Sequence, residues 1–325
     1  VGSEMCIRDR VLGLRQGFVQ SLARVAIVIV ALLGAAWPSM YPQLGAGVSW
    51  AGGVSMIISV GTIVSSLASE RLNTRLGTGR VTALSVATTA VALLGFSTCT
   101  EFWQLCLWGI PYGLGAGSVD AALNNYVALH YKAKHMSWLH CFWGVGTIVS
   151  PFIMSYALAN RTWNSGYRMV GLIQLGIALL LLVTLPVWNV NQSTSREDGK
   201  SVGLTGALKI KGVPFLLLGF FAYCAAEATT MQWASTYFVE VKGIAADRAA
   251  GFAALFYIGI TVGRFISGII TDRLGDRKMI LLGTGILVCG IFILCLPVKS
   301  YTVAFAAFLV IGLGLSLIHI SEPTR

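Results

Sequence analysis

Three ionisable side chains interrupt long apolar stretches of the sequence, and they are the ones best placed to do chemistry. They are Asp120, Glu227 and Arg264. A charge inside a bilayer is costly, so an ionisable residue within a membrane span marks a substrate or ion pathway by default. A carboxyl group there can exchange protons, and a guanidinium group can bind an anion. Candidate functional chemistry therefore centres on these three positions.

Polar and aromatic side chains surround Glu227 in the sequence. Tyr223, Thr230, Gln232 and Trp233 lie in the same apolar stretch, and we expect them to form one polar and aromatic side of a helix. Amide, hydroxyl and indole donors beside a carboxylate suit a sugar or another polyhydroxylated solute. The alternative is that Glu227 makes a structural hydrogen bond to a neighbouring helix.

Asp120 is followed by two amide side chains. Asn124 is four residues further on and shares a helical face with Asp120, and Asn125 comes next. A carboxylate and an amide can therefore face one cavity, and the predicted role is substrate binding or proton coupling. Alternatively, Asp120 ties its helix to a neighbour through hydrogen bonds.

Arg264 and His140 each allow more than one interpretation. Arg264 could pair with a buried carboxylate, bind an anionic substrate or extend toward the inner membrane surface. His140 lies near the start of a predicted span and could relay protons at physiological pH. An interfacial histidine that is hydrogen-bonded to backbone is the other interpretation of His140.

Composition places these residues in a bilayer. Of 325 residues, 56% are hydrophobic and only 11% are charged, and the hydrophobic residues come in runs of about 20, the length of a membrane span. We therefore predict an all-α, polytopic membrane protein. The predicted spans are 19–41, 48–69, 81–99, 102–130, 138–159, 168–190, 214–239, 249–270, 279–297 and 301–314.

The net charge of +10 lies mainly in short loops between these spans. Basic residues are concentrated in the loops on the side of the first terminus, which is the positive-inside pattern of a cytoplasmic face. We therefore expect a multi-pass protein of the plasma membrane, which for a bacterium is the inner membrane. The same pattern argues against nucleic acid as a partner.

Two charged, glycine-containing hairpins repeat in the sequence. Their positions differ by 202 residues as far as position 72, where a four-residue insertion at 73–76 follows in the first copy. Such a repeat predicts two similar halves, the architecture of secondary transporters. The charged residues could form a latch between the halves that gates the inner side, or each hairpin could be a short positive turn. The residues concerned are Glu70, Arg71, Gly77 and Arg80 in the first copy, and Gly268, Asp272, Arg273, Gly275, Arg277 and Lys278 in the second.

The longest polar stretch divides the chain. We expect a cytoplasmic linker at 191–213 between an amino-terminal six-helix half at 11–190 and a carboxy-terminal half at 214–314. One codon choice for 315–325 has a reverse complement that encodes the first ten residues. Residues 1–10 and 315–325 therefore resemble translated library-adapter sequence, and we expect the tenth span to be truncated.

The second hairpin resembles the signature of the major facilitator superfamily, Gly-x-x-x-Asp-Arg/Lys-x-Gly-x-Arg-Arg/Lys. The first hairpin departs from this signature, with Ser66 in place of the first glycine and Glu70 in place of the aspartate. Residues 113–125 and 138–146 look like the corresponding segments of fucose-permease-type sugar:proton symporters and their bacterial relatives. The resemblance implies two six-helix bundles and alternating access. Those relatives often carry a carboxylate in the first span, where this chain has none.

Together these features predict a proton-coupled uptake transporter for a sugar-like polar solute, which we expect to be a monomer. A proton-driven exporter of drugs or metabolites is the alternative, and a non-transporting receptor of the same fold is an alternative of another class. We expect no enzyme activity, cofactor or metal site. The sequence has no Gly-x-x-x-x-Gly-Lys segment for ATP, and its cysteines lack metal-ligand spacing.

Small residues also predict where helices cross closely. The pairs Gly113 with Gly117 and Gly259 with Gly263 are each spaced by four residues, so each pair presents a smooth helical face. Such faces allow two backbones to approach one another within a membrane.

Overall fold

The computed structural model describes residues 29–130, 133–188, 206, 208–298 and 300–318. Within these ranges only the backbone is described at 29–31, 128–130, 133–142, 187, 188, 268, 269, 271–273 and 276. All regular secondary structure in the described part is helical, as predicted. The helices are α2 (Ile29–Gln43), the 3-10 turn η1 (Val48–Trp50), α3 (Ala51–Leu76), α4 (Thr78–Phe96), α5 (Phe102–His130), α6 (Ala133–Asn160), α7 (Trp163–Val183), α8 (Leu185–Trp188), α10 (Val213–Glu240), α11 (Ala246–Leu274), α12 (Asp276–Cys295) and α13 (Tyr301–Ile318).

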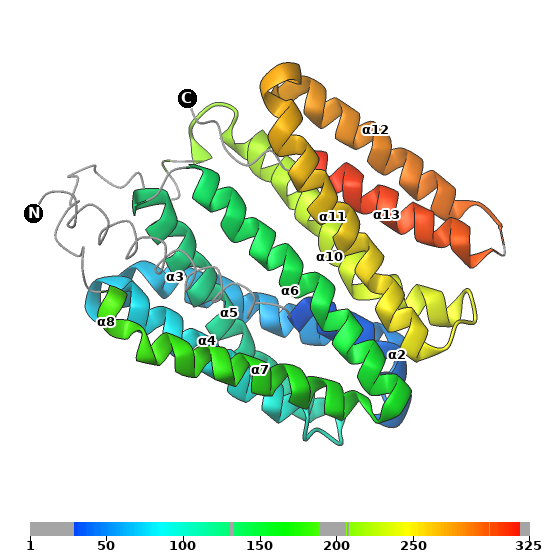
Figure 1. The fold of residues 1–325 in the computed structure, drawn as a ribbon, viewed down its shortest axis with the longest axis horizontal. Coiled ribbons are helices and arrows are strands. Elements are labelled where there is room, and N and C mark those ends of the chain that lie inside the picture. The colour runs from blue at the N-terminus through cyan, green and yellow to red at the C-terminus, as the bar shows by residue number, and fades with distance from the viewer. Residues whose placement is uncertain (1–28, 131–132, 189–205, 207, 299, 319–325) are drawn as a thin grey trace, which may run out of the picture.

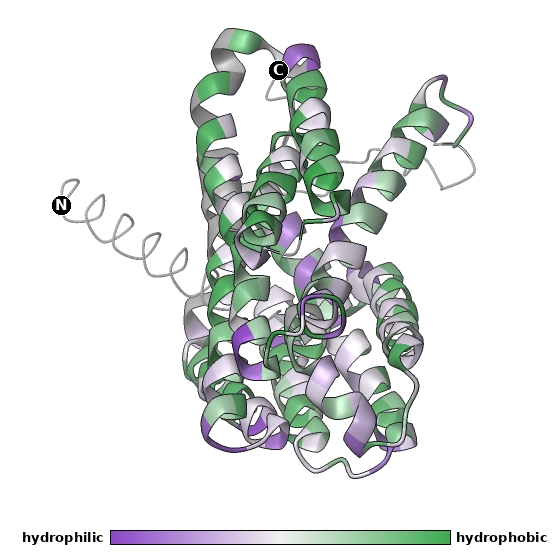
Figure 2. Cartoon of the chain, turned by 90° about the vertical axis from the view of Figure 1, so that its right-hand side faces the viewer, coloured by the Kyte–Doolittle hydropathy of each residue, from purple (hydrophilic) through white to green (hydrophobic). Residues whose placement is uncertain are grey.

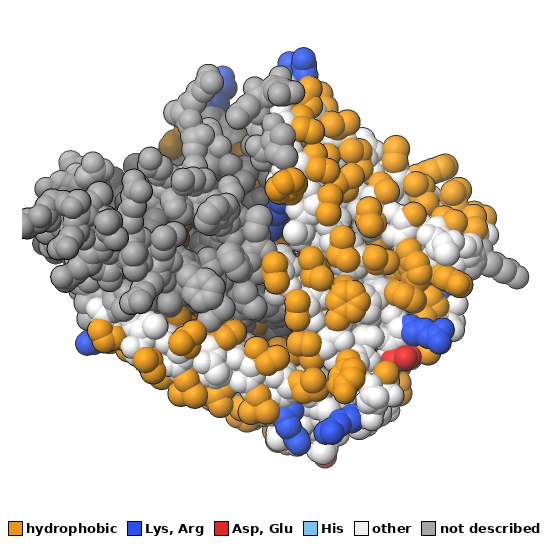
Figure 3. Space-filling view, viewed as in Figure 1, with side chains coloured by type: hydrophobic (Ala, Val, Ile, Leu, Met, Phe, Trp, Pro, Cys, Tyr) orange, Lys and Arg blue, Asp and Glu red, His pale blue; other side chains and the backbone are white. Residues whose placement is uncertain are grey.

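Ten of these helices correspond to the predicted spans, and seven meet criteria of length and hydropathy for crossing a membrane within the described residues. Hydrophobic residues dominate along the helices, and hydrophilic residues gather mainly near the helix ends (Figure 2). Apolar side chains also cover much of the described surface in the view of Figure 3. An apolar outer surface of this kind is what a lipid environment requires. The last helix continues to Ile318, beyond the predicted boundary at 314, and Leu315 and Leu317 are buried.

The helices form two groups, α2–α8 and α10–α13 (Figure 1). In the first group α5 packs against α3 and α4, and α4 packs against α7. In the second group α13 packs against both α11 and α12. The groups meet where α2 contacts α10 and where α6 contacts α11 (Figure 1). These two groups are called the amino-terminal and carboxy-terminal halves below.

The repeated hairpins have the same backbone in both halves. Gly77 separates α3 from α4 at φ 82°, and Gly275 separates α11 from α12 at φ 74°. Each glycine carbonyl then accepts the first bond of the next helix, from Val81 N at 3.1 Å and from Met279 N at 3.2 Å. Because only glycine adopts positive φ at little cost, both turns depend on it. The two hairpins of the sequence repeat thus share one backbone conformation.

The predicted glycine-lined crossings are also confirmed. Added side chains on Gly113 and Gly117 would overlap the α3 backbone, and an added side chain on Gly259 would overlap the α13 backbone. A Cβ atom on Gly263 would lie 2.7 Å from Ser316 Cβ. Both halves therefore bring a helix pair into backbone contact in the same way.

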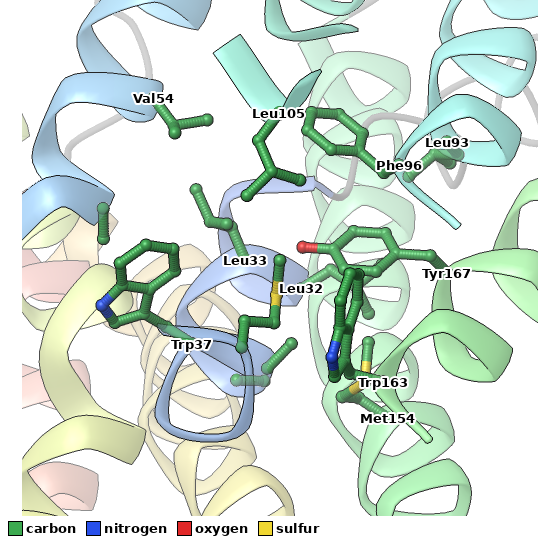
Figure 4. Packing of buried hydrophobic residues seen from close by; sticks show 14 of the residues in the cluster. Leu32, Leu33, Trp37, Val54, Leu93, Phe96, Leu105, Met154, Trp163 and Tyr167 are labelled. Atoms are coloured by element: carbon green, nitrogen blue, oxygen red, sulfur yellow. The ribbon is translucent and has the colours of Figure 1, made fainter. Parts of the chain in front are cut away.

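The largest buried cluster joins several helices of the amino-terminal half. Leu33 and Trp37 of α2 meet Leu105 of α5, with Phe96 and Tyr167 from α4 and α7 (Figure 4). Ala250 of α11 belongs to the same cluster, so this core also attaches the carboxy-terminal half. Trp233 of α10 packs against the same cluster, so the cluster also links α2 to α10.

Candidate functional site

The structure brings together side chains of α10 and α11. Tyr223 and Glu227 are one turn apart on α10 and face the same way. Glu227 lies within electrostatic reach of Tyr223 on its own helix and of Arg264 and Tyr257 on α11. Two of the three ionisable residues singled out by the sequence therefore belong to one site.

The amino-terminal half contributes an aromatic ring to this site. The Arg264 guanidinium carbon lies 4.9 Å from the centre of the Trp143 ring on α6. A guanidinium group that stacks on indole in a dry environment gains cation–π attraction. The site therefore spans the contact between α6 and α11, and hence both halves.

Several polar atoms in this site are buried without a hydrogen-bond partner among the described residues. They are Glu227 Oε1, Arg264 Nε, Arg264 Nη1 and the Tyr257 hydroxyl oxygen. No ion pair joins Glu227 to Arg264, although the structure describes both side chains. Leaving a buried polar group unpaired costs about 1–3 kcal/mol, and more when the group is charged. This cluster of unsatisfied groups therefore has the chemistry of a site that receives a polar ligand.

Gln232 and Trp233 lie elsewhere, so the predicted single polar side of α10 is divided. Ser55 Oγ on α3 donates to Gln232 Oε1 at 2.7 Å, and Trp233 packs against the core cluster that contains Trp37. Thr230 donates to the Ala226 carbonyl at 2.9 Å. The reason is helical geometry: at roughly 100° per residue, Gln232 and Trp233 turn away from Glu227. They join the halves instead of lining the site.

Asp120 and Asn124 share a face of α5, as predicted. Asn124 Nδ2 donates to Asp120 Oδ2 at 3.3 Å, and Asn125 is exposed. The carboxylate thus has a local amide partner, unlike Glu227 Oε1. Their role in proton coupling stays a prediction.

The structure describes the side chains of only some of the residues predicted to form the gate. Glu70, Arg71 and Arg80 are exposed, as are Arg277 and Lys278. The side chains of His140, Asp272 and Arg273, like the surroundings of Gly268, fall outside the description. The latch between the halves therefore remains a prediction.

Three residues of this region were missed by sequence reasoning. Tyr257 precedes Arg264 by seven residues, two helical turns, so the spacing alone could have indicated it. Sequence spacing could not indicate the other two residues, because they come from other helices. Trp143 of α6 contacts Arg264, and Ser55 of α3 contacts Gln232.

Hydrogen bonds between the halves lie on one side of the site. In addition to the Ser55–Gln232 bond, Ser235 Oγ donates to the Ala35 carbonyl at 3.2 Å, and the Tyr41 hydroxyl donates to Glu240 Oε1 at 2.7 Å. These three bonds join the halves, and they lie toward the ends of α2 and α10 at Gln43 and Glu240. The positive-inside pattern predicts that this is the outer side. These bonds thus join the halves on that side of the site, in addition to the packing of α6 against α11.

Comparison with known proteins places this geometry in a wider context. The family model of the Major Facilitator Superfamily matches residues 19–324. The "Bypass of stop codon protein 6" of Saccharomyces cerevisiae is 26% identical over 67% of this chain and 49% of its own length. The glucose/mannose transporter GlcP of Bacillus subtilis is 21% identical over 68% of this chain and 56% of its own length. The chain thus spans about half the length of these two relatives.

Among solved structures, a D-xylose–proton symporter superposes with a TM-score of 0.70 and 14% sequence identity. The superposition covers 93% of this chain and 80% of that structure. At this identity the likeness concerns the fold alone, which is the two-half helical architecture described above.

Proposed function

Because the chain belongs to the Major Facilitator Superfamily, a family of transporters and not of enzymes, we propose that it carries a small polar, sugar-like solute into the cell together with protons. It acts as a monomer in the plasma membrane. The observation that carries the proposal is the buried Glu227 carboxylate, whose Oε1 has no hydrogen-bond partner among the described residues. A carboxyl group in this position can bind a proton and release it when its surroundings change.

The surrounding groups support a polar solute. Tyr223 and Tyr257 offer hydroxyl groups next to Glu227, and Trp143 adds an aromatic ring. Binding sites for sugar-like molecules combine apolar or aromatic walls with a few convergent polar groups. The relation to a glucose/mannose transporter favours the same substrate class.

Alternating access follows from the duplicated halves. The halves are joined on the outer side by α2 and α10, and the site lies between α6, α10 and α11. In the proposal the halves rock about this site, opening it to one side at a time. The charged hairpins after α3 and α11 then act as the latch of the inner side.

The test measures uptake of a labelled sugar panel into proteoliposomes that contain the full chain, with and without an inward proton gradient. We expect Glu227→Gln to abolish gradient-driven accumulation and to retain exchange of internal for external solute. The physical reason is that the amide keeps the shape of the side chain but cannot carry a proton.

The matched control is Glu101→Gln, since Glu101 is an exposed carboxylate at the start of α5. Normal pH-dependent accumulation by Glu227→Gln would falsify the coupling role. Movement of solute outward against protons would instead identify an exporter, and saturable binding without any flux would identify a receptor.

A further inference from the structure

We propose that the transported solute is a hydroxylated carboxylic acid of the sugar-acid class, and that Arg264 binds its carboxylate. This inference rests on the transport function proposed above and specifies the substrate of the same site. It starts from Arg264, because a guanidinium group with unused donors selects anions.

Arg264 lies deep within its helix. It precedes the end of α11 at Leu274 by ten residues, about 15 Å at the rise of an α-helix. Its Nε and Nη1 atoms are buried and make no hydrogen bond among the described residues. An arginine that extended to the membrane surface would have these atoms in water, so burial excludes that interpretation here. The Nε and Nη1 donors of Arg264 therefore lie in the protein interior, where a bound ligand could accept their hydrogen bonds.

Trp143 holds the guanidinium group from the other half. The Arg264 guanidinium carbon lies over the Trp143 ring. A guanidinium group that stacks with its face on an aromatic ring keeps the N–H groups at its edge available. A carboxylate binds arginine at this edge through charge-assisted hydrogen bonds. Trp143 thus orients Arg264 for an anion without consuming its donors.

Glu227 and Arg264 both interact with Tyr223, and they do not use all of their polar atoms on one another. The two side chains interact electrostatically, yet no ion pair forms and each retains unpartnered atoms. A ligand that supplies a carboxylate to Arg264 and a hydroxyl group to Glu227 satisfies both residues at once. The Tyr257 hydroxyl, also unpartnered, offers a third contact for such a ligand. A neutral sugar would supply no carboxylate to Arg264, and a simple anion would supply no hydroxyl group to Glu227. A hydroxylated acid therefore fits the site better than either.

Access to Arg264 is linked to movement between the halves. The Nε and Nη1 atoms of Arg264 are buried beside the contact between α6 and α11. In this proposal an acidic group reaches them when these helices separate, which changes the Trp143–Arg264 contact. Binding of the acid is thus coupled to the rocking movement that alternating access requires.

The experiment compares sugars with their own acids on the purified full chain. The probes are D-glucose with D-glucuronate, D-galactose with D-galacturonate, and D-glucitol with D-gluconate, and binding is followed by tryptophan fluorescence and by ligand-induced thermal stabilisation. We expect at least one acid to bind roughly 10- to 100-fold more tightly than its neutral partner, the usual magnitude of a charge-assisted hydrogen bond.

Arg264→Gln should remove this preference, and Arg264→Lys should keep part of it because it retains the charge. The matched control is Arg248→Gln, since Arg248 is an exposed residue on the same helix. If Arg264→Gln does not fold, the comparison of acid with neutral partner on the unaltered protein and on Arg264→Lys still decides the matter.

Equal or tighter binding of the neutral partners overturns the inference, as does the absence of binding by every acid or an unchanged preference in Arg264→Gln. These outcomes are separate from the proposed transport function. Gradient-driven uptake of a neutral sugar would support the proposed transport function and contradict the acid site. Acid binding without flux would support the acid site and contradict the transport function.

Discussion

Helices α3 and α11 occupy equivalent places in the two halves, and their comparison shows what the duplication kept and what it changed. Ser59 donates to the Ser55 carbonyl at 2.8 Å, and Thr261 donates to the Tyr257 carbonyl at 2.9 Å. Further along, Ser65 donates to the Thr62 carbonyl at 3.2 Å, and the equivalent Ser267 donates to the Arg264 carbonyl at 3.0 Å. The local bonding of the two helices is therefore conserved within the chain.

The difference lies at the position shared by Thr62 and Arg264. Thr62 Oγ1 donates to the Ile58 carbonyl at 2.9 Å and lies 3.3 Å from the Gly113 carbonyl, so its polar group is satisfied within its own half. Arg264 at the equivalent place keeps unpartnered donors. At this position the packing was thus preserved in both halves, whereas the polar side chain with unpartnered atoms is found only in the carboxy-terminal copy.

The strongest test of the shared packing uses Gly113→Val and Gly312→Val. Each added side chain meets helix backbone, of Ile58 in the first case and of Phe256 in the second. We expect both variants to lose about 3 kcal/mol or more of stability, because backbone cannot move aside as a side chain can. Thermal denaturation in detergent measures the loss.

The matched control for these variants is Gly285→Val, since nothing lies within 4 Å of a Cβ atom there. Tolerance of valine at Gly113 but not at Gly312, or the reverse, would show that the two crossings are not equivalent.

A smaller effect is expected at the two hairpin glycines. Gly77→Ala and Gly275→Ala each place a Cβ atom on a residue with positive φ, at 82° and 74°. We expect each substitution to destabilise by about 1–2 kcal/mol. The measurement is again the midpoint of thermal denaturation, and clearly unequal losses would contradict a common hairpin backbone.

The smallest effect contrasts Ser55 with its equivalent Tyr257. Ser55→Ala removes a hydrogen bond to Gln232, and we expect a loss of about 1 kcal/mol. Tyr257→Phe removes a hydroxyl group without a described partner, so stability should be unchanged or slightly higher while solute binding weakens. Denaturation and binding assays on both variants check this. A stability loss in Tyr257→Phe equal to that in Ser55→Ala would mean that the hydroxyl group is structural.

Much of the fold was predictable because each membrane helix is indicated by its own run of neighbouring residues. Runs of apolar residues indicate where each helix lies, and the recurrence of glycine at 77 and 275 indicates the hairpins. Part of the site was predictable for the same reason, since Glu227 and Arg264 interrupt apolar runs. Gln232 and Trp233 do not lie on the predicted side with Glu227, because a short polar segment on a helix turns through more than one face.

Residues close together in the chain therefore specify the helical spans, each of the glycine hairpins and the ionisable residues within the spans. Tertiary structure alone decided which groups meet and which remain unsatisfied. Trp143 reaches Arg264 only because α6 of one half packs against α11 of the other. Glu227 and Arg264 each keep unpartnered atoms, because the packing of α10 on α11 and not the sequence spacing sets how the two side chains meet. Contacts between distant segments depend on the packing of whole helices, and no local pattern encodes that packing.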